Sequence, residues 1–144
     1  TSNALAKILC QKFWDISPKF IDGEQSFEEK IGGRTAGVII GDRANAYRDS
    51  FEYRYDLSEE WKKFTSLPFV FACWVSNTPL EEEKELAFCK ALEYGIDNLE
   101  MAIDSKSHLF DTKIDKKKYL TEIIDYHLND DKRKAMQLFF ELMP

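Results

Sequence analysis

Residues 35–42 read Thr-Ala-Gly-Val-Ile-Ile-Gly-Asp, and this stretch decides the fold class that the sequence predicts. Apolar and β-branched side chains fill residues 35–40, and a Gly-Gly pair before the run and Gly41 after it mark its ends. Such a run is typical of a strand that is buried on both faces, as in a parallel sheet. Short helices are predicted on either side, at residues 26–31 and 43–47. This alternation of helix and strand favours an α/β fold with parallel pairing.

Three further segments are predicted to be strands, at residues 18–21, 51–57 and 69–75. Residues 51–57 alternate apolar and polar side chains, which indicates a strand with one covered face. Residues 69–75 form the most hydrophobic segment and are expected to be a central strand. Two short strands within the first fifty residues are too few for an independent sheet, so further strands of that sheet are expected outside this chain.

The other predicted elements are helices, because apolar residues recur in them at three- and four-residue spacing. The third of these helices begins at Thr78-Pro79, since proline suits the first turn. Ser58 is the expected cap of the second helix, and Asn129 or Asp130 that of the last. The predicted helices span residues 1–14, 59–64, 78–103, 115–128 and 130–143.

The composition excludes several classes of protein. The 144 residues carry 20 Lys and Arg against 26 Asp and Glu, for a net charge of −6. This balance argues against nucleic acid as a partner, because non-specific binding needs a basic surface. Hydrophobic residues make up 44% of the chain, which is enough to bury a core and to exclude a disordered chain. The longest apolar run, residues 67–75, is about half of the ~18–20 residues of a membrane helix, so no membrane partner is expected.

Cysteine and histidine usage predicts neither a disulfide framework nor a metal site. Cys10, Cys73 and Cys89 form no CxxC pair and lie among apolar neighbours, which predicts buried free thiols in a reducing, cytoplasmic compartment. His108 and His127 are far apart in the sequence, so a zinc site or a His-based triad is not expected.

Two places in the sequence have the residue types of a ligand site. Thr1, Ser2 and Asn3 begin a predicted helix, where hydroxyls, free N–H groups and the positive dipole end attract a carboxylate or phosphate. Plain N-capping is the alternative. Gly41 and Asp42 follow a predicted buried strand, and ligands of open α/β sheets bind at such strand ends. A turn followed by an Asp cap is the alternative there.

Three strings of the sequence, at residues 1–5, 35–44 and 55–74, resemble the menaquinone-biosynthesis family of chorismate dehydratases. The third string is the most specific, since a helix beginning Asp-Leu and containing Trp is followed by Leu-Pro-Phe-Val-Phe-Ala. Dihydroxynaphthoate synthases of the same pathway share the family fold. They diverge after the Leu-Pro and carry a catalytic histidine that has no counterpart placed in this chain.

The resemblance implies a type II periplasmic-binding-protein-like fold, in which two α/β lobes enclose a cleft. Residues 1–50 would then be part of the inserted second lobe, and residues 51–144 the return strand, central strand and C-terminal helices of the first. The N-terminal part of lobe one would be absent from this chain, so the chain alone is expected to be inactive. The helices from residue 115 onward are expected either to pack on the first lobe or to form a homodimer interface.

The resemblance also implies a reaction, the removal of water from chorismate to give 3-[(1-carboxyvinyl)oxy]benzoate, with no metal or organic cofactor. It implies that residues 1–3 bind a chorismate carboxylate, that Gly41 and Asp42 line the facing wall, and that Phe69 lies near the cleft floor. Asp42 is the candidate catalytic group, and the substrate's own carboxylate is the alternative base. A non-catalytic, solute-binding protein of the same fold is the alternative function.

Overall fold

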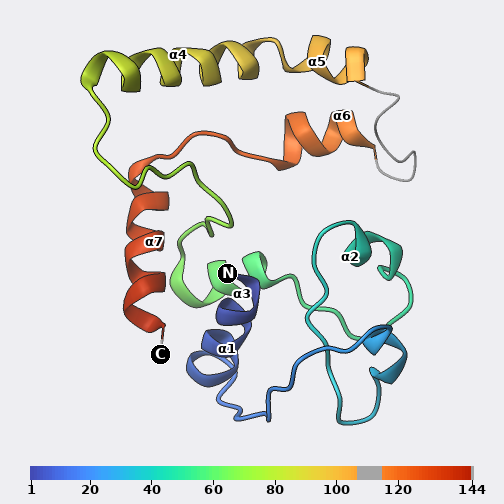
Figure 1. The fold of residues 1–144 in the computed structure, drawn as a ribbon. Coiled ribbons are helices and arrows are strands. Elements are labelled where there is room, and N and C mark those ends of the chain that lie inside the picture. Colours follow the sequence, from blue (N-terminus) through green and yellow to red (C-terminus); the bar gives the residue numbers. More distant parts are fainter. Residues whose placement is uncertain (107–114, 144) are drawn as a thin grey trace. The chain divides into compact units, whose positions relative to one another are not determined.

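The computed structural model describes residues 1–106 and 115–143, except for the side chains of Asp42 and Lys116. The described residues are mainly helical (Figure 1). The elements are α1 (Ser2–Lys12), the 3₁₀ turn η1 (Phe27–Lys30), α2 (Asp42–Ala46), α3 (Leu57–Thr65), α4 (Glu82–Asp97), α5 (Leu99–Lys106), α6 (Lys116–Lys118), the π-helical turn η3 (Tyr119–Ile123) and α7 (Asp130–Leu142).

The chain divides into two compact units. Unit 1 consists of Thr1–Ala72 and Asn129–Pro144, so it contains α1, α2, α3 and α7. Unit 2 is the continuous segment Cys73–Leu128, which contains α4, α5, α6 and η3. The division into lobes at residue 50 that the sequence suggests stays a prediction.

The core of unit 1 is a cluster of apolar side chains from three helices. Residues 5, 8 and 9 of α1 lie on one helical face because they are three and four positions apart. This face packs against α3, whose Trp61 is fully buried. α7 contributes Phe139, which is buried too. The cluster consists of Leu5, Ile8, Leu9, Trp61 and Phe139.

Trp61 lies at the centre of this cluster. Its indole ring meets Phe69 edge to face at 5.4 Å between ring centroids and Phe139 at 6.2 Å. Its Nε1–H donates to the Pro68 carbonyl oxygen at 3.2 Å, so the one polar atom of the ring is satisfied. Edge-to-face contacts add to the free energy gained by burying the rings. Trp61 therefore fixes α3, α7 and residues 68–69 to one another.

A buried carboxylate joins the end of α1 to α3. Glu60 accepts from Trp14 Nε1 at 3.1 Å and from Lys63 Nζ at 2.5 Å, and its side chain is 8% exposed. The hydrogen bond from Lys63 holds the pKa of Glu60 below its ordinary value, against the opposing effect of burial. Both carboxylate oxygens have a donor, so burial of this charge is compensated.

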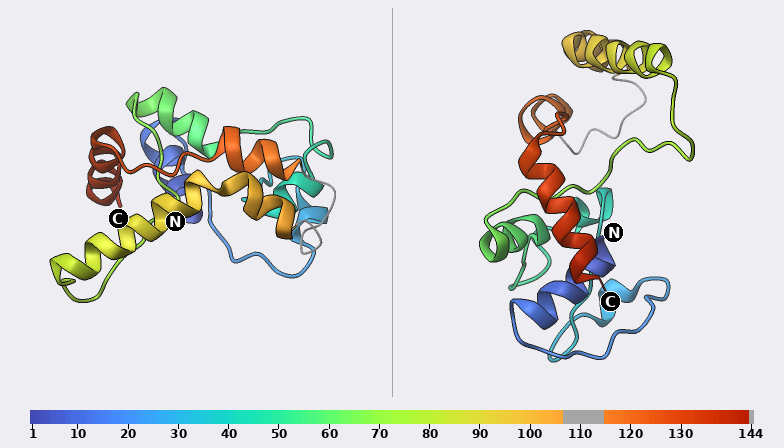
Figure 2. Two further views of the ribbon diagram at one scale, coloured as in Figure 1. Left: turned by 90° about the horizontal axis from the view of Figure 1, so that it is seen from above. Right: turned by 90° about the vertical axis from the view of Figure 1, so that its left-hand side faces the viewer.

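The expected α/β, two-lobed fold is wrong for the residues that the structure describes. In residues 1–106 and 115–143 no sheet is present, and the one β-bridge is the isolated antiparallel pair of Gly32 and Thr35. The views in Figure 2 accordingly draw coiled ribbons and connecting segments for this part of the chain. The four strands predicted at residues 18–21, 35–40, 51–57 and 69–75 are not formed.

The predicted strands fail because a strand exists only where its N–H and C=O groups pair with a neighbouring segment. The alternation of side chains in these segments is a local property of the sequence. In the described structure some of these residues pack against helices instead of forming a sheet. In residues 69–75 the ring of Phe69 packs into the helical cluster, while Trp74 and Val75 are 75% and 83% exposed. Gly37 packs its backbone against η1, where a Cβ would lie 2.6 Å from Ile31 Cδ1.

Several helix predictions are confirmed, with shifted ends. Asn129 caps α7 by accepting the Lys132 N–H at 3.0 Å, as predicted. The cap of α3 is Asp56 rather than Ser58, because its carboxylate accepts from the N–H groups of Ser58 and Glu59. The helix expected from Pro79 begins only at Glu82. The helix expected over residues 115–128 ends at Ile123, after which the chain is extended.

Burial differs strongly between the helices. Neither α4 nor α5 has a fully buried residue, so the apolar residues whose spacing predicts a helix over residues 78–103 are only partly covered. Cys10 is buried, as predicted for the free thiols, and burial raises its pKa. The prediction is wrong for Cys73 and Cys89, which are exposed. The exposure of Cys73 follows from the missing sheet, since this residue lies in the segment that was expected to be the central strand.

Candidate functional site

The first turn of α1 carries the residues that the sequence proposes as a carboxylate site. Thr1 is the N-cap residue, yet its side chain makes no capping hydrogen bond, and no acidic residue lies in the first turn. Thr1 and Asn3 are exposed, and Ser2 is half-buried. The Thr1 side chain therefore does not cap the helix by a hydrogen bond, and the carboxylate site at residues 1–3 stays a prediction. The first-turn N–H groups and these hydroxyl and amide groups suit a carboxylate acceptor.

Gly41 begins α2 with a backbone that suits glycine. Its φ of 63° and ψ of −146° lie in a region that other residues enter only at a cost in free energy. Nothing lies within 4 Å of the position that a Cβ would occupy, so one side of this turn is open. The backbone of Asp42 opens the helix, but its side chain is outside the described part, and its catalytic role stays a prediction.

Directly after Asp42 lies an ion pair that the sequence did not single out. The guanidinium of Arg43 donates to Glu28 Oε1, and it lies over the Phe27 ring at 5.5 Å from the centroid. The pair joins α2 to η1, which are separated by a loop. Charge spacing in the sequence gives no signal for it, because the two residues are 15 positions apart in different elements.

Phe69, the predicted contact on the cleft floor, packs into the core of unit 1. Its ring meets Trp61 at 5.4 Å, Phe139 at 5.2 Å and Phe71 at 4.7 Å between centroids. The side chain is half-buried, and Phe71 is 49% exposed. Phe69 thus stabilises the aromatic cluster, and its contact with substrate stays a prediction.

The structure brings only some of these residues together. α1 packs on α3, and Phe69 packs on Trp61 of α3, so residues 1–3 and Phe69 belong to one packed group of elements. Among the described elements, α2 does not pack extensively with α1. Arg43 and Gly41 therefore form a second group, in which the Arg43 side chain contacts Glu28 and Phe27 of η1 and Gly41 lies two positions before Arg43.

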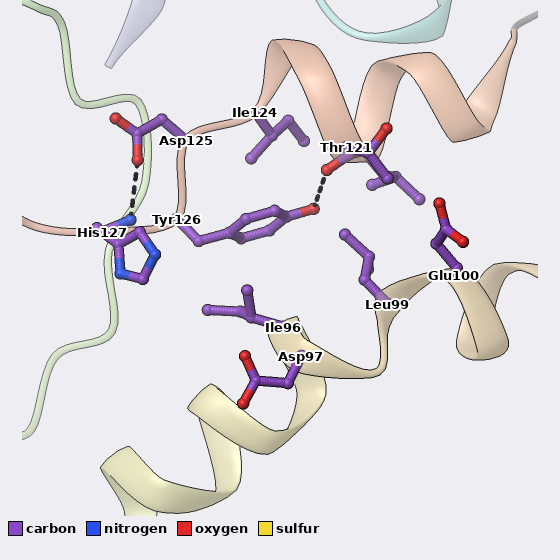
Figure 3. A pocket seen from close by; sticks show the side chains of 10 residues that line it. Ile96, Asp97, Leu99, Glu100, Thr121, Ile124, Asp125, Tyr126 and His127 are labelled. Atoms are coloured by element: carbon purple, nitrogen blue, oxygen red, sulfur yellow. Dashed lines mark hydrogen bonds between the residues drawn. The ribbon is translucent and has the colours of Figure 1, made fainter.

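Unit 2 contains a separate cavity of about 390 Å³ between the end of α4, the start of α5 and the segment from η3 onward. The ring of Tyr126 lies between Ile124 on one side and Ile96 and Leu99 on the other (Figure 3). The residues lining the cavity are Ile96, Asp97, Leu99, Glu100, Leu120, Thr121, Ile124, Asp125, Tyr126 and His127. His127 falls within the helix predicted over residues 115–128, but it lies in the extended segment after η3. His108 lies outside the described residues.

The polar groups around this cavity are largely engaged with one another. Tyr126 donates its hydroxyl to the Leu120 carbonyl at 3.0 Å, and burial raises its pKa, with a smaller contribution from Tyr119. Glu100 pairs with Lys117 at 3.0 Å, and this hydrogen bond raises the lysine pKa. Among the described residues, three carboxylates line the cavity, of which Glu100 is paired with a lysine, so the described lining disfavours a dianionic ligand.

Among the described residues, no three His, Cys, Asp or Glu side chains are grouped so as to hold a metal ion. No helix in the described part of the chain is both long and apolar enough to cross a membrane.

The comparison with solved structures finds no match. The family model for menaquinone biosynthesis matches residues 1–144. Because this match covers the whole of the given sequence, the chain belongs to the menaquinone biosynthesis family.

Proposed function

We propose that this member of the menaquinone biosynthesis family is a chorismate dehydratase, which removes water from chorismate to give 3-[(1-carboxyvinyl)oxy]benzoate. The observation that carries the proposal is the first turn of α1, where Thr1, Ser2 and Asn3 offer donors and the Thr1 side chain makes no capping hydrogen bond. Family membership supports the pathway, and the helix start supports a substrate with a carboxylate.

The reaction needs little from the protein beyond orientation and one proton transfer. A base takes a proton from a ring carbon, the C–O bond of the ring hydroxyl breaks, and proton and hydroxide leave as one water. Loss of water alone converts the cyclohexadiene ring into a benzene ring, so no oxidant or reductant is consumed, and the aromatisation supplies much of the driving force. The protein holds the dianion, assists the proton transfer and helps the hydroxide to leave.

In this proposal the residues have distinct roles. Residues 1–3 bind a carboxylate through the helix N-terminus and their own side chains, and the open turn at Gly41 lets substrate approach the backbone. Asp42 is the proposed base, and the second carboxylate of the substrate is the alternative. Phe69 contributes an apolar surface. The net charge of −6 does not oppose a dianion, because local N–H donors and not the net charge hold a carboxylate.

The test is an assay of the natural gene product that contains these residues, with chorismate as substrate and chromatographic detection of the benzoate product. Ser2→Ala is expected to lower kcat/KM by about 5- to 150-fold, since a hydrogen bond to a charged group contributes about 1–3 kcal/mol. Ser105→Ala is the matched control, because Ser105 is exposed on α5 and donates only to the Ala102 carbonyl at 3.0 Å.

Three outcomes decide the proposal. Product formation with a large Ser2→Ala effect and an unchanged Ser105→Ala rate supports it. Unchanged kinetic constants in Ser2→Ala show that Ser2 does not contact the substrate, and they reject the proposed role of this residue. Chorismate binding without any product rejects the dehydratase and indicates a non-catalytic binding protein instead.

A further inference from the structure

The ion pair between Arg43 of α2 and Glu28 of η1 places an exposed cation on a buried anion. The side chain of Glu28 is 1% exposed, whereas that of Arg43 is 59% exposed. The Phe27 ring supports the guanidinium from a second direction, at 5.5 Å from its centroid. Planar guanidinium groups stack well on aromatic faces, so the two contacts limit where the charged end of Arg43 can lie.

The buried carboxylate of Glu28 differs from that of Glu60, which is also buried in unit 1. Glu60 has a donor on each oxygen, from Trp14 and from Lys63, and it joins the segment after α1 to α3. Glu28 has one oxygen on Arg43, and its Oε2 atom is buried without a hydrogen-bond partner among the described residues. Both oxygens of Glu60 therefore hold neighbouring segments of the fold together, whereas the hydrogen bond to Glu28 holds the guanidinium of Arg43.

Burying a carboxylate costs free energy, and an oxygen without a partner adds to that cost. The cost is difficult to explain by stability alone, because an apolar residue would fill the same space at lower cost. It is explained if the pair presents a guanidinium in a fixed orientation. Preorganised groups of this kind are typical of binding sites.

A guanidinium held in this way has N–H donors left for a ligand. Arginine carries five N–H donors in a planar fork, and Glu28 Oε1 takes only one edge of it. The remaining donors match the two oxygens of a carboxylate, which arginine binds in a bidentate manner. Arg43 lies two positions after Gly41, whose turn is open to solvent.

We propose that Arg43 binds a carboxylate of the substrate beside Gly41, and that Glu28 is a positioning residue that orients the guanidinium. This inference rests on the proposed function, because chorismate supplies the carboxylate. It adds a specificity-determining residue to that site: a substrate analogue without the carboxylate loses the contact.

The test measures KM and kcat for chorismate in Arg43→Ala, Arg43→Lys and Glu28→Gln. Arg43→Ala is expected to raise KM by about 10- to 100-fold with kcat changed less than about threefold, as for loss of a charge-assisted hydrogen bond. Arg43→Lys is expected to recover little, because lysine lacks the fork. Guanidinium chloride at low millimolar concentration is expected to restore KM in Arg43→Ala. Glu28→Gln is expected to raise KM by a smaller factor, without rescue.

Arg133→Ala is the matched control, because Arg133 is exposed on α7 and lies in neither group of site residues. Unchanged KM in Arg43→Ala overturns the inference, and so does a defect in kcat alone. Loss of helicity in Arg43→Ala, measured by circular dichroism, assigns the ion pair to stability and overturns it as well.

A second measurement separates this inference from the proposed reaction. Benzoate is titrated into the wild-type protein, and the Arg43 Nε–H resonance, assigned by its loss in Arg43→Lys, is followed by NMR. A saturable shift of this resonance that is absent in Glu28→Gln supports carboxylate binding even if chorismate is not turned over. Turnover of chorismate without this shift supports the dehydratase and rejects the role of Arg43.

Discussion

Replacement of Trp61 by alanine is expected to destabilise unit 1 more than any other substitution of a tryptophan in this chain. Trp61 is fully buried and contacts side chains from α1, α3 and α7. Truncation of a buried tryptophan typically costs about 3–5 kcal/mol, because burial is lost and a cavity remains. A domain of this size is typically stable by only about 5–15 kcal/mol, so the variant is expected to be close to unfolding.

The structure also separates the two contributions that Trp61 makes. Trp61→Phe keeps an aromatic ring in the cluster but removes the Nε1–H that donates to the Pro68 carbonyl at 3.2 Å. This variant is expected to lose about 1–3 kcal/mol, because a partly buried acceptor is left without its partner. The free energy of unfolding is therefore expected to be highest for the wild type, lower for Trp61→Phe and lowest for Trp61→Ala.

The measurement is urea unfolding followed by far-ultraviolet circular dichroism. Trp74→Ala is the matched control, because Trp74 is 75% exposed and packs on Phe88 at 5.4 Å within unit 2. It is expected to change the free energy of unfolding by less than about 1 kcal/mol, as for an exposed aromatic pair. Equal effects of Trp61→Ala and Trp74→Ala would refute the placement of Trp61 at the centre of the core.

Two further predictions concern charge and capping in unit 1. The pKa of Glu60 is lowered in the folded state by its hydrogen bond from Lys63, so this carboxylate stabilises the fold above the ordinary glutamate pKa. That stabilisation is lost as the pH falls through the lowered pKa. In Glu60→Gln the free energy of unfolding is expected to fall less steeply between neutral and acid pH than in the wild type. Identical pH dependence in the two proteins would contradict this prediction. Asn129→Ala is expected to cost about 1 kcal/mol in urea unfolding, because it removes the acceptor for the Lys132 N–H at 3.0 Å, whereas Asn129→Asp should be neutral.

The helices of unit 1 could be predicted from the sequence because their signals are local. Residues 5, 8 and 9 are spaced for one helical face, and that face is the buried face of α1. Asn129 could be identified as a cap, since a cap involves an N–H group only a few positions away in the chain. The predicted start of α3 lies two residues too far along the chain. Asp56 and Ser58 are both residue types that cap helices well, and only the observed geometry shows which of them is the cap.

The strands could not be predicted reliably, because the pattern of a strand does not contain its partner. Residues 69–75 have the composition of a central strand, but β-propensity largely reflects packing against neighbours that the segment itself does not supply. The ion pair of Arg43 and Glu28 was missed for the same reason, since its two residues meet through the path of an intervening loop.

The sequence by itself determined the positions of most helices of the described chain, the apolar face of α1 and the family of the protein. Only the tertiary structure decided that residues 35–40 and 69–75 form no sheet, that Trp61 is the centre of the core, and that Glu28 holds Arg43. Helix periodicity and capping act over three or four residues of one chain. Sheet pairing, aromatic packing and buried ion pairs join distant segments, and their free energy depends on which segments meet.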